Sequence, residues 1–99
     1  MNFSNETIQK VWGKGSIVSG ANINRWRKDQ CYAWIGWEYY GNRSSIYGWE
    51  IDHIKPESEG GSDDLSNLRP LQWENNASTQ AGRLTCSVTS SGNQNIRRG

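Results

Sequence analysis

Aromatic side chains are the feature that most constrains what this chain can fold into. The sequence has 99 residues, which is enough for one compact domain with a modest core. Six tryptophans and four tyrosines supply much of the apolar bulk, since each can bury roughly 150–250 Å². The tryptophans are spread from Trp12 to Trp73. We therefore expect the aromatics to form the core, with base stacking as the less favoured alternative.

The charges are nearly balanced but unevenly placed. Eleven Lys and Arg residues face ten Asp and Glu residues, for a net charge of +1. This balance argues against a polybasic binder, whose affinity comes mainly from neutralising phosphates. Arg25, Arg27 and Lys28 cluster, whereas residues 57–64 are acidic. Two interpretations are equally compatible with this pattern. Either a nucleic acid binds the basic side, or the charges are solvated and have no partner.

The cysteines and the single histidine limit the kinds of metal site. Cys31 and Cys86 lie far apart, and His53 is the one histidine, so a structural zinc site with four Cys or His ligands cannot be built. The opening MNFSNETIQK is not an apolar signal region, and no run is long and apolar enough for a membrane. We expect a cytoplasmic protein with both thiols free, the alternative being a Cys31–Cys86 disulfide.

Turn residues and apolar spacing predict an order of elements along the chain. Ser4 is the expected N-cap of the first helix, which Gly13 and Gly15 end. The polar tail is expected to be flexible. The predicted elements are a helix at 5–12, a short strand near 17–18, strands at 31–37 and 47–53, a loop at 55–64, an extended return at 65–70, a helix over 71–84 with Gly82 as its candidate end, and a tail at 87–99.

The most informative segment is WEIDHIKPESEGGSDDLSNLRPLQWENNASTQ, from Trp49 to Gln80. It has an Asp-His pair at a strand end, a Gly-Gly-Ser-Asp loop, then Asn-Leu-x-Pro-Leu and Trp-x-Asn-Asn. This segment resembles the HNH nuclease family, and the stretch 12–47 resembles small bacterial and phage members more weakly. The resemblance implies an α+β fold with a ββα-metal (His-Me finger) core at about 47–84, inside a single domain of residues 1–99 with an N-terminal helix and extra short strands.

The resemblance also implies an endonuclease that hydrolyses DNA, with a role for each motif residue. His53 would be the general base, because a histidine is often neutral near pH 7 and can accept a proton. Asp52 and Asn76 would hold one divalent cation, and their hard oxygens suit Mg²⁺ or Mn²⁺. Asn67 would hold the histidine ring in its useful tautomer, or fix the loop.

Three positions leave questions that the sequence does not answer. Spacing alone does not choose between Asn75 and Asn76, which point nearly 100° apart on a helix; the family pattern favours Asn76. Thr79 stands where many relatives have a lysine that contacts phosphate, and we hypothesise that Arg83 compensates. Tyr32 stands where many relatives have glycine.

Double-stranded DNA is the expected partner, with a homodimer or a specificity-providing protein as further options and no membrane contact. The balanced charge predicts contacts to about three to five phosphates at once. The alternative function is a nucleic-acid-binding module that keeps the HNH fold without cleavage, which the missing lysine at Thr79 favours and the intact Asp-His-Asn-Asn set opposes. An interaction scaffold is a third option. The expected phosphate contacts are Lys55, Arg69, Arg83, Arg25, Arg27 and Lys28.

Overall fold

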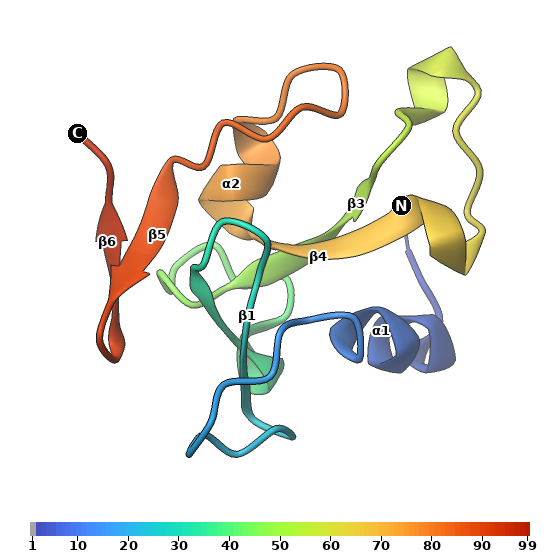
Figure 1. The fold of residues 1–99 in the computed structure, drawn as a ribbon. Coiled ribbons are helices and arrows are strands. Elements are labelled where there is room, and N and C mark those ends of the chain that lie inside the picture. The colour runs from blue at the N-terminus through green and yellow to red at the C-terminus, as the bar shows by residue number, and fades with distance from the viewer. Residues whose placement is uncertain (1) are drawn as a thin grey trace.

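The computed structural model describes residues 2–99 as an α+β fold of short elements (Figure 1). The predicted α+β class is confirmed, and the strands pair as three antiparallel hairpins, β1–β2, β3–β4 and β5–β6. None of the helices in residues 2–99 is long and apolar enough to cross a membrane. The elements are α1 (Asn5–Trp12), β1 (Trp26–Lys28), β2 (Trp34–Gly36), β3 (Trp49–His53), β4 (Leu68–Gln72), α2 (Trp73–Ala77), β5 (Val88–Ser91) and β6 (Gln94–Arg97), with 3-10 turns at Trp37–Tyr39, Glu57–Glu59 and Leu65–Asn67.

The β3–β4 hairpin is the centre of the fold, with α1 and α2 on either side of it (Figure 1). Its register places Asp52 opposite Arg69 and His53 opposite Leu68. Trp49 and Ile51 are buried, whereas Glu50 and Asp52 on the other face are partly exposed. This alternation is the one that the sequence predicts.

Aromatic residues form much of the core, as expected. Trp49 is fully buried, and the ring centroids of Trp12, Trp37 and Tyr40 lie 5.2, 6.2 and 4.8 Å from its own. These tilted and edge-to-face contacts are the arrangements that aromatic pairs prefer. Helix α1 contributes Trp12 to this cluster and begins at the predicted cap, because the Ser4 side chain accepts a hydrogen bond from the Thr7 N–H.

A buried carboxylate, which the sequence analysis did not single out, joins three parts of the chain. Asp29 is 3% exposed. One carboxylate oxygen accepts the backbone N–H groups of Cys31 and Ala33, each at 2.9 Å. The other accepts the backbone N–H of Gln72 at 2.9 Å and the amide of Asn75 at 3.0 Å. Burial raises the pKa of Asp29 above its ordinary value, and these four donors act in the opposite direction.

The second helix is shorter than predicted, covering Trp73–Ala77 instead of 71–84. The hydroxyl groups of Ser78 and Thr79 donate back to the carbonyls of Asn75 and Asn76, which offers the chain an alternative to further helical turns. Residues 80–83 then form a tight turn in which Ala81 and Gly82 have φ of 52° and 82°. Gly82 lies so close to the Ile54 carbonyl that a Cβ would come within 2.2 Å of its oxygen. The prediction of a helix that continues over 78–84 is therefore wrong.

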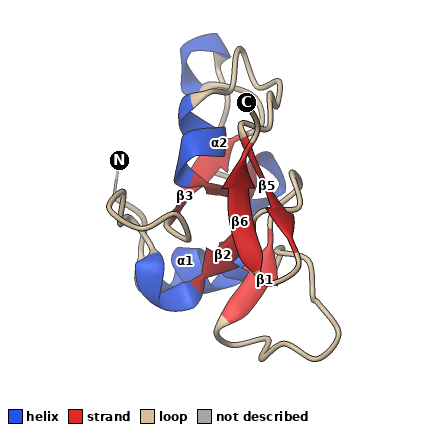
Figure 2. Ribbon diagram, turned by 90° about the vertical axis from the view of Figure 1, so that its left-hand side faces the viewer, coloured by secondary structure: helices blue, strands red, loops and turns tan. Residues whose placement is uncertain are grey.

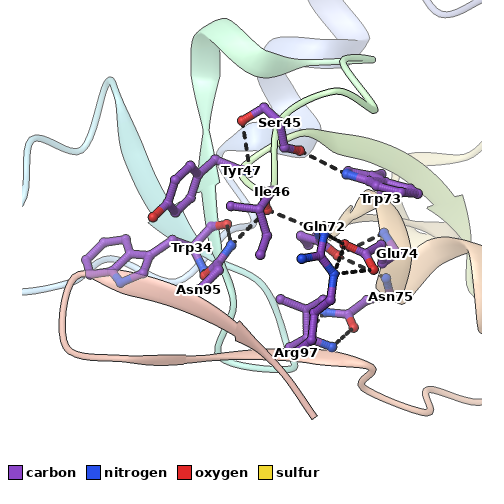
Figure 3. Close-up of polar contacts among 11 residues, drawn as sticks. Trp34, Ser45, Ile46, Tyr47, Gln72, Trp73, Glu74, Asn75, Asn95 and Arg97 are labelled. Carbon is purple, nitrogen blue, oxygen red and sulfur yellow. Dashed lines mark hydrogen bonds and ion pairs between the residues drawn. The ribbon is translucent and has the colours of Figure 1, made fainter. Parts of the chain in front are cut away.

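The tail predicted to be flexible forms the β5–β6 hairpin beside β2 (Figure 2). Buried Asn95 accepts a hydrogen bond from the Trp34 N–H at 2.6 Å and donates to the carbonyls of Trp34 and Ile46 (Figure 3). Arg97 forms an ion pair with Glu74 of α2. Side-chain bonds to distant backbone order this segment, and its local polar composition contains no signal of them.

The prediction of free thiols is wrong, because Cys31 and Cys86 form a disulfide. The bond ties the segment that follows α2 to the β1–β2 turn. Next to it, Tyr32 has φ of 64° and is 72% exposed. A left-handed backbone favours glycine, so glycine would adopt this conformation with less strain than tyrosine does. The strand expected near 17–18 is also absent from the described residues, where only Ser16 bridges to Lys28.

Replacing Asp29 by asparagine should destabilise the fold. Each oxygen of Asp29 accepts hydrogen bonds from two N–H groups. Whichever oxygen the NH₂ group of asparagine replaces, two of these buried hydrogen bonds would be lost. We expect a loss of about 3 kcal/mol and a fall in Tm of roughly 10–20 °C, measured by thermal unfolding. Glu38→Gln, which removes an exposed ion pair with Arg25, is the control and should change Tm little. An unchanged Tm for Asp29→Asn would contradict the role assigned to this carboxylate.

Candidate active site

One cleft of about 340 Å³ brings together three of the predicted site residues, Asp52, His53 and Asn76. Asp52 and His53 end β3, and Asn76 projects from α2. Thr79 and Gly82, from the segment after α2, line the same cleft. Strand β3 and helix α2 are in contact, so residues 23 positions apart in the sequence meet at one end of the β3–β4 hairpin.

His53 is held by a carboxylate that the sequence analysis did not assign a role. Its side chain is 12% exposed, and Nε2 lies 2.7 Å from an oxygen of Asp63. An ionised carboxylate can only accept, so this contact places the hydrogen of a neutral ring on Nε2 and leaves the lone pair on Nδ1. Glu57 is 3.9 Å from Nδ1, beyond hydrogen-bonding distance. The Gly-Gly-Ser-Asp loop was recognised, but its turn chemistry does not reveal where the Asp63 side chain points.

Asn67 fixes the loop that carries Glu57 and Asp63, and no hydrogen bond joins it to His53 among the described residues. Its amide accepts from the Lys55 N–H at 2.8 Å and donates to the carbonyls of Lys55 and Ser62 at 3.1 and 2.8 Å. Gly61 closes the loop so tightly that a Cβ there would lie 1.8 Å from the Lys55 oxygen. Of the two roles expected for Asn67, the loop contact is the one that the structure has, and Asp63 makes the ring contact.

Arg69 holds Asp52 rather than facing solvent. Its Nε donates to Asp52 Oδ2 at 2.8 Å, and its Nη2 donates to the Gly82 carbonyl at 2.8 Å. Arg69 is only 7% exposed, so the expected phosphate contact is replaced by an internal ion pair, which follows from the cross-strand pairing of the two residues. The other oxygen of Asp52 accepts no hydrogen bond from the described residues and remains available for a ligand.

The two neighbouring asparagines have different environments. Asn75 is fully buried; its amide donates to Asp29 and to the Val88 carbonyl and accepts the Val88 N–H. Asn76 lines the cleft and donates to Glu50 Oε1 at 2.8 Å, which leaves its own amide oxygen uncommitted among the described residues. This geometry agrees with the choice of Asn76 over Asn75 as the candidate ligand.

Glu50 orients Asn76 and is itself held by Arg43. The Arg43 guanidinium donates to both oxygens of Glu50, at 2.7 and 2.9 Å, and lies over the Trp73 ring at 5.6 Å from its centroid. Burial acts to raise the pKa of Glu50, but the hydrogen bonds from Arg43 and Asn76 outweigh it and keep this pKa below its ordinary value. Glu50 is therefore an ionised acceptor, and the sequence offered only its alternation with Asp52 as a signal.

Most of the expected phosphate-binding cations have partners within the protein. Arg27 donates to the carbonyls of Gly13, Gly15 and Ile23, and Lys28 lies over the Trp34 ring. Arg25 pairs with Glu38 at the surface, an exposed pair of little energetic value. Near the cleft, Lys55 and Arg83 are exposed, and no ion pair engages them among residues 2–99. Arg83 lies on the tight turn after α2 instead of on the helix.

The environments of the two asparagines predict opposite effects of alanine substitution. Asn76→Ala should weaken Mn²⁺ binding in a calorimetric titration and leave Tm within a few degrees. Asn75→Ala should leave Mn²⁺ binding intact but cost about 2–3 kcal/mol of unfolding free energy, because buried partners lose their hydrogen bonds. Equal losses of Mn²⁺ binding in both variants would mean that the helix register is misassigned.

Comparison with known proteins identifies part of this region. Residues 40–76 match the family model of the HNH endonuclease. The match covers a little over a third of the chain and includes all of β3, the loop, β4 and α2 as far as Asn76. No curated protein and no solved structure matches the chain.

Proposed function

We propose, from the premise that residues 40–76 are an HNH endonuclease segment, that this protein is a metal-dependent endonuclease that hydrolyses phosphodiester bonds in DNA. The observation that carries the proposal is the cleft shared by Asp52, His53 and Asn76. In this proposal β3, β4 and α2 are the ββα-metal core, and the other elements support it.

The donors in the cleft fit one divalent cation of the Mg²⁺ type. Asp52 and Asn76 each have one oxygen that the described residues do not engage, and hard oxygen ligands are those that Mg²⁺ prefers. Two protein ligands leave most of the coordination shell to water and substrate. A cation held there supplies positive charge next to the phosphate oxygens on which charge develops during hydrolysis.

The chain's own residues supply the proton acceptor. His53 Nδ1 carries the lone pair and takes the proton of the attacking water. Asp63, 2.7 Å from Nε2, keeps the ring in this tautomer and stabilises the imidazolium as it forms. Arg69 and Glu50 act as positioning residues, since Arg69 orients Asp52 and Glu50 orients Asn76.

Lys55 and Arg83 are the proposed phosphate contacts, because they are the exposed cations on the two segments that flank the cleft. Phosphate contacts position a duplex without reading its sequence. Sequence preference would then come from a second copy of the chain or from a partner protein.

A cleavage-deficient DNA-binding module is the second candidate. The observation that favours it is Thr79, whose hydroxyl donates to the Asn76 carbonyl and offers no positive charge where many relatives have lysine. The uncommitted oxygens of Asp52 and Asn76 favour the enzyme.

Removing the base should abolish most cleavage. His53→Ala should lower the rate of Mg²⁺-dependent plasmid nicking by roughly 10²–10⁴-fold, the range expected for loss of a general base. Circular dichroism should show an intact fold, since the ring lies at the edge of the core. Cleavage by His53→Ala at the parent rate would rule out this mechanism.

The small number of exposed basic side chains near the cleft sets the salt dependence of DNA binding. Two phosphate contacts predict a slope of about −2 for log affinity against log salt, because each contact contributes about −0.9. This slope is shallower than the slope expected from the three to five phosphate contacts that the composition predicts. Arg83→Ala should reduce the slope by about 1 and weaken binding equally on unrelated duplexes. A loss confined to one sequence would indicate base readout instead.

A further inference from the structure

The Cys31–Cys86 disulfide ties the loop between α2 and β5, orange in Figure 1, to the β1–β2 turn. No residue of this loop from 80 to 86 is buried. Among the described residues, one hydrogen bond joins residues 80–86 to a part of the chain outside the loop, and in it Arg69 Nη2 donates to the Gly82 carbonyl at 2.8 Å. The disulfide is therefore the strongest link between this loop and the rest of the domain.

The backbone is left-handed at both ends of the disulfide. Tyr32, Ala81 and Cys86 are the residues other than glycine with positive φ among residues 2–99, at 64°, 52° and 51°. A residue with a Cβ adopts this conformation at a cost, and it persists only where the surrounding structure enforces it. Cys86 is one end of the bond, and Tyr32 follows the other end in the sequence. Opening the bond would let both residues leave the left-handed region.

Arg69 connects the two segments that the disulfide joins to the proposed metal ligand Asp52. Its Nε donates to Asp52 Oδ2 at 2.8 Å. Its Nη1 and Nη2 donate to Gln30 Oε1 at 3.3 Å and to the Gly82 carbonyl at 2.8 Å. Gln30 is next to one cysteine in the sequence, and Gly82 comes four residues before the other. The disulfide thus holds together the two segments that position the arginine beside Asp52.

We propose that the Cys31–Cys86 disulfide is a redox switch of the nuclease, in which reduction releases residues 80–86 and weakens metal binding at Asp52. The effect on metal and on cleavage rests on the function proposed above. When the loop moves away, Arg69 loses its contact with Gly82, and the orientation of Asp52 is no longer fixed. Loss of a group that orients a metal ligand typically lowers metal affinity by roughly 10–100-fold.

The release is confined to the loop, because both of its flanks have other anchors. On one side, buried Asn75 in α2 is held by Asp29. On the other side, Val88 at the start of β5 exchanges two hydrogen bonds with the Asn75 amide. None of these contacts includes a cysteine side chain. Reduction should therefore leave α2 and β5 in place while the chain between them opens locally.

The reductant is a dithiol, and it reaches the bond from the side of Cys86. Cys31 is 3% exposed, whereas Cys86 is only half-buried, so a thiolate attacks the Cys86 sulfur. A mixed disulfide forms there, and the Cys31 sulfur leaves as a thiolate that takes up a proton. The second thiol of the reductant then displaces the Cys86 sulfur. Two electrons and two protons pass to the protein, and the dithiol becomes a cyclic disulfide.

Trypsin tests the release without any activity, because Arg83 lies inside the loop. Cleavage after Arg83 should be roughly tenfold faster when the parent has been reduced with dithiothreitol, which is removed before digestion, since proteolysis follows the population of the open form. A double variant, Cys31→Ala with Cys86→Ala, should be cleaved like the reduced parent. Cleavage after Arg43, an exposed residue remote from the disulfide in the sequence, should be the same in all forms.

The same digest separates local release from global unfolding. Lys10 precedes Val11, which is fully buried in α1, so cleavage after Lys10 reports unfolding of the domain. Equal cleavage after Arg83 in the oxidised and reduced parent overturns the proposal. Cleavage after Lys10 that rises together with cleavage after Arg83 also overturns it, because the bond would then stabilise the whole fold instead of one loop.

Metal binding is measured with the double variant, so that no dithiol competes for the ion. Calorimetric titration with Mn²⁺ should show roughly tenfold weaker binding to the double variant than to the oxidised parent. Thr85→Ala is the control, because it removes a hydrogen bond within the loop, from the Thr85 hydroxyl to the Ser78 carbonyl, but keeps the disulfide. It should bind Mn²⁺ as the parent does. Equal affinities of the parent and the double variant would contradict the coupling through Arg69.

The effect on cleavage is tested in plasmid nicking at sub-saturating Mg²⁺. Reduction of the parent should lower the rate roughly tenfold, in line with the weaker metal binding, and reoxidation should restore it. The double variant should be slow with and without dithiol. Equal rates of the oxidised and reduced parent would refute the switch. A parent that never cleaves in either state refutes the proposed function instead, while trypsin and the Mn²⁺ titration still decide whether the disulfide controls the loop and the metal.

Discussion

The Asp29 carboxylate is the interaction on which the rest of the structure depends. Its four hydrogen bonds join the β1–β2 turn, the last residue of β4 and the buried amide of Asn75 in α2. Asn75 in turn pairs with Val88 at the start of β5. With the Cys31–Cys86 disulfide beside it, this centre fixes three short hairpins that are too small to be stable separately. Because α2 is anchored through Asn75, its neighbour Asn76 is directed into the cleft.

The cleft itself is a set of paired charges around one histidine. Asp52 and Glu50 are each held by an arginine, and the loop fixed by Asn67 presents Asp63 to the ring. Asp52, Asn76 and His53, the proposed ligands and base, therefore each keep one atom that the described residues do not hydrogen-bond, while another atom is held by the protein. Preorganisation of this kind is what hydrolytic chemistry requires, because the groups need not reorganise during the reaction.

Sequence reasoning identified the elements whose signals are local and missed those that depend on distant partners. The capped helix α1 and the alternation along β3 follow from local spacing, whereas the grouping of Asp52, His53 and Asn76 follows from the resemblance to the HNH family. The β5–β6 hairpin depends on Asn95 bonding to Trp34, 61 residues away, which no local pattern reveals. The turn at 80–83, which stands where the sequence predicts helix, depends on the close approach of Gly82 to Ile54. The motif named Asn67, but only the fold shows that Asp63 contacts the ring.

The central claim is that this cleft cleaves DNA with the help of a divalent cation, and plasmid nicking by the purified chain tests it most directly. Supercoiled plasmid should be converted to the nicked form when Mg²⁺ or Mn²⁺ is present and should stay supercoiled when a chelator removes the ion. Plasmid that is bound but remains supercoiled at every Mg²⁺ and Mn²⁺ concentration would contradict the proposed nuclease activity. The protein would then be a DNA-binding module without cleavage.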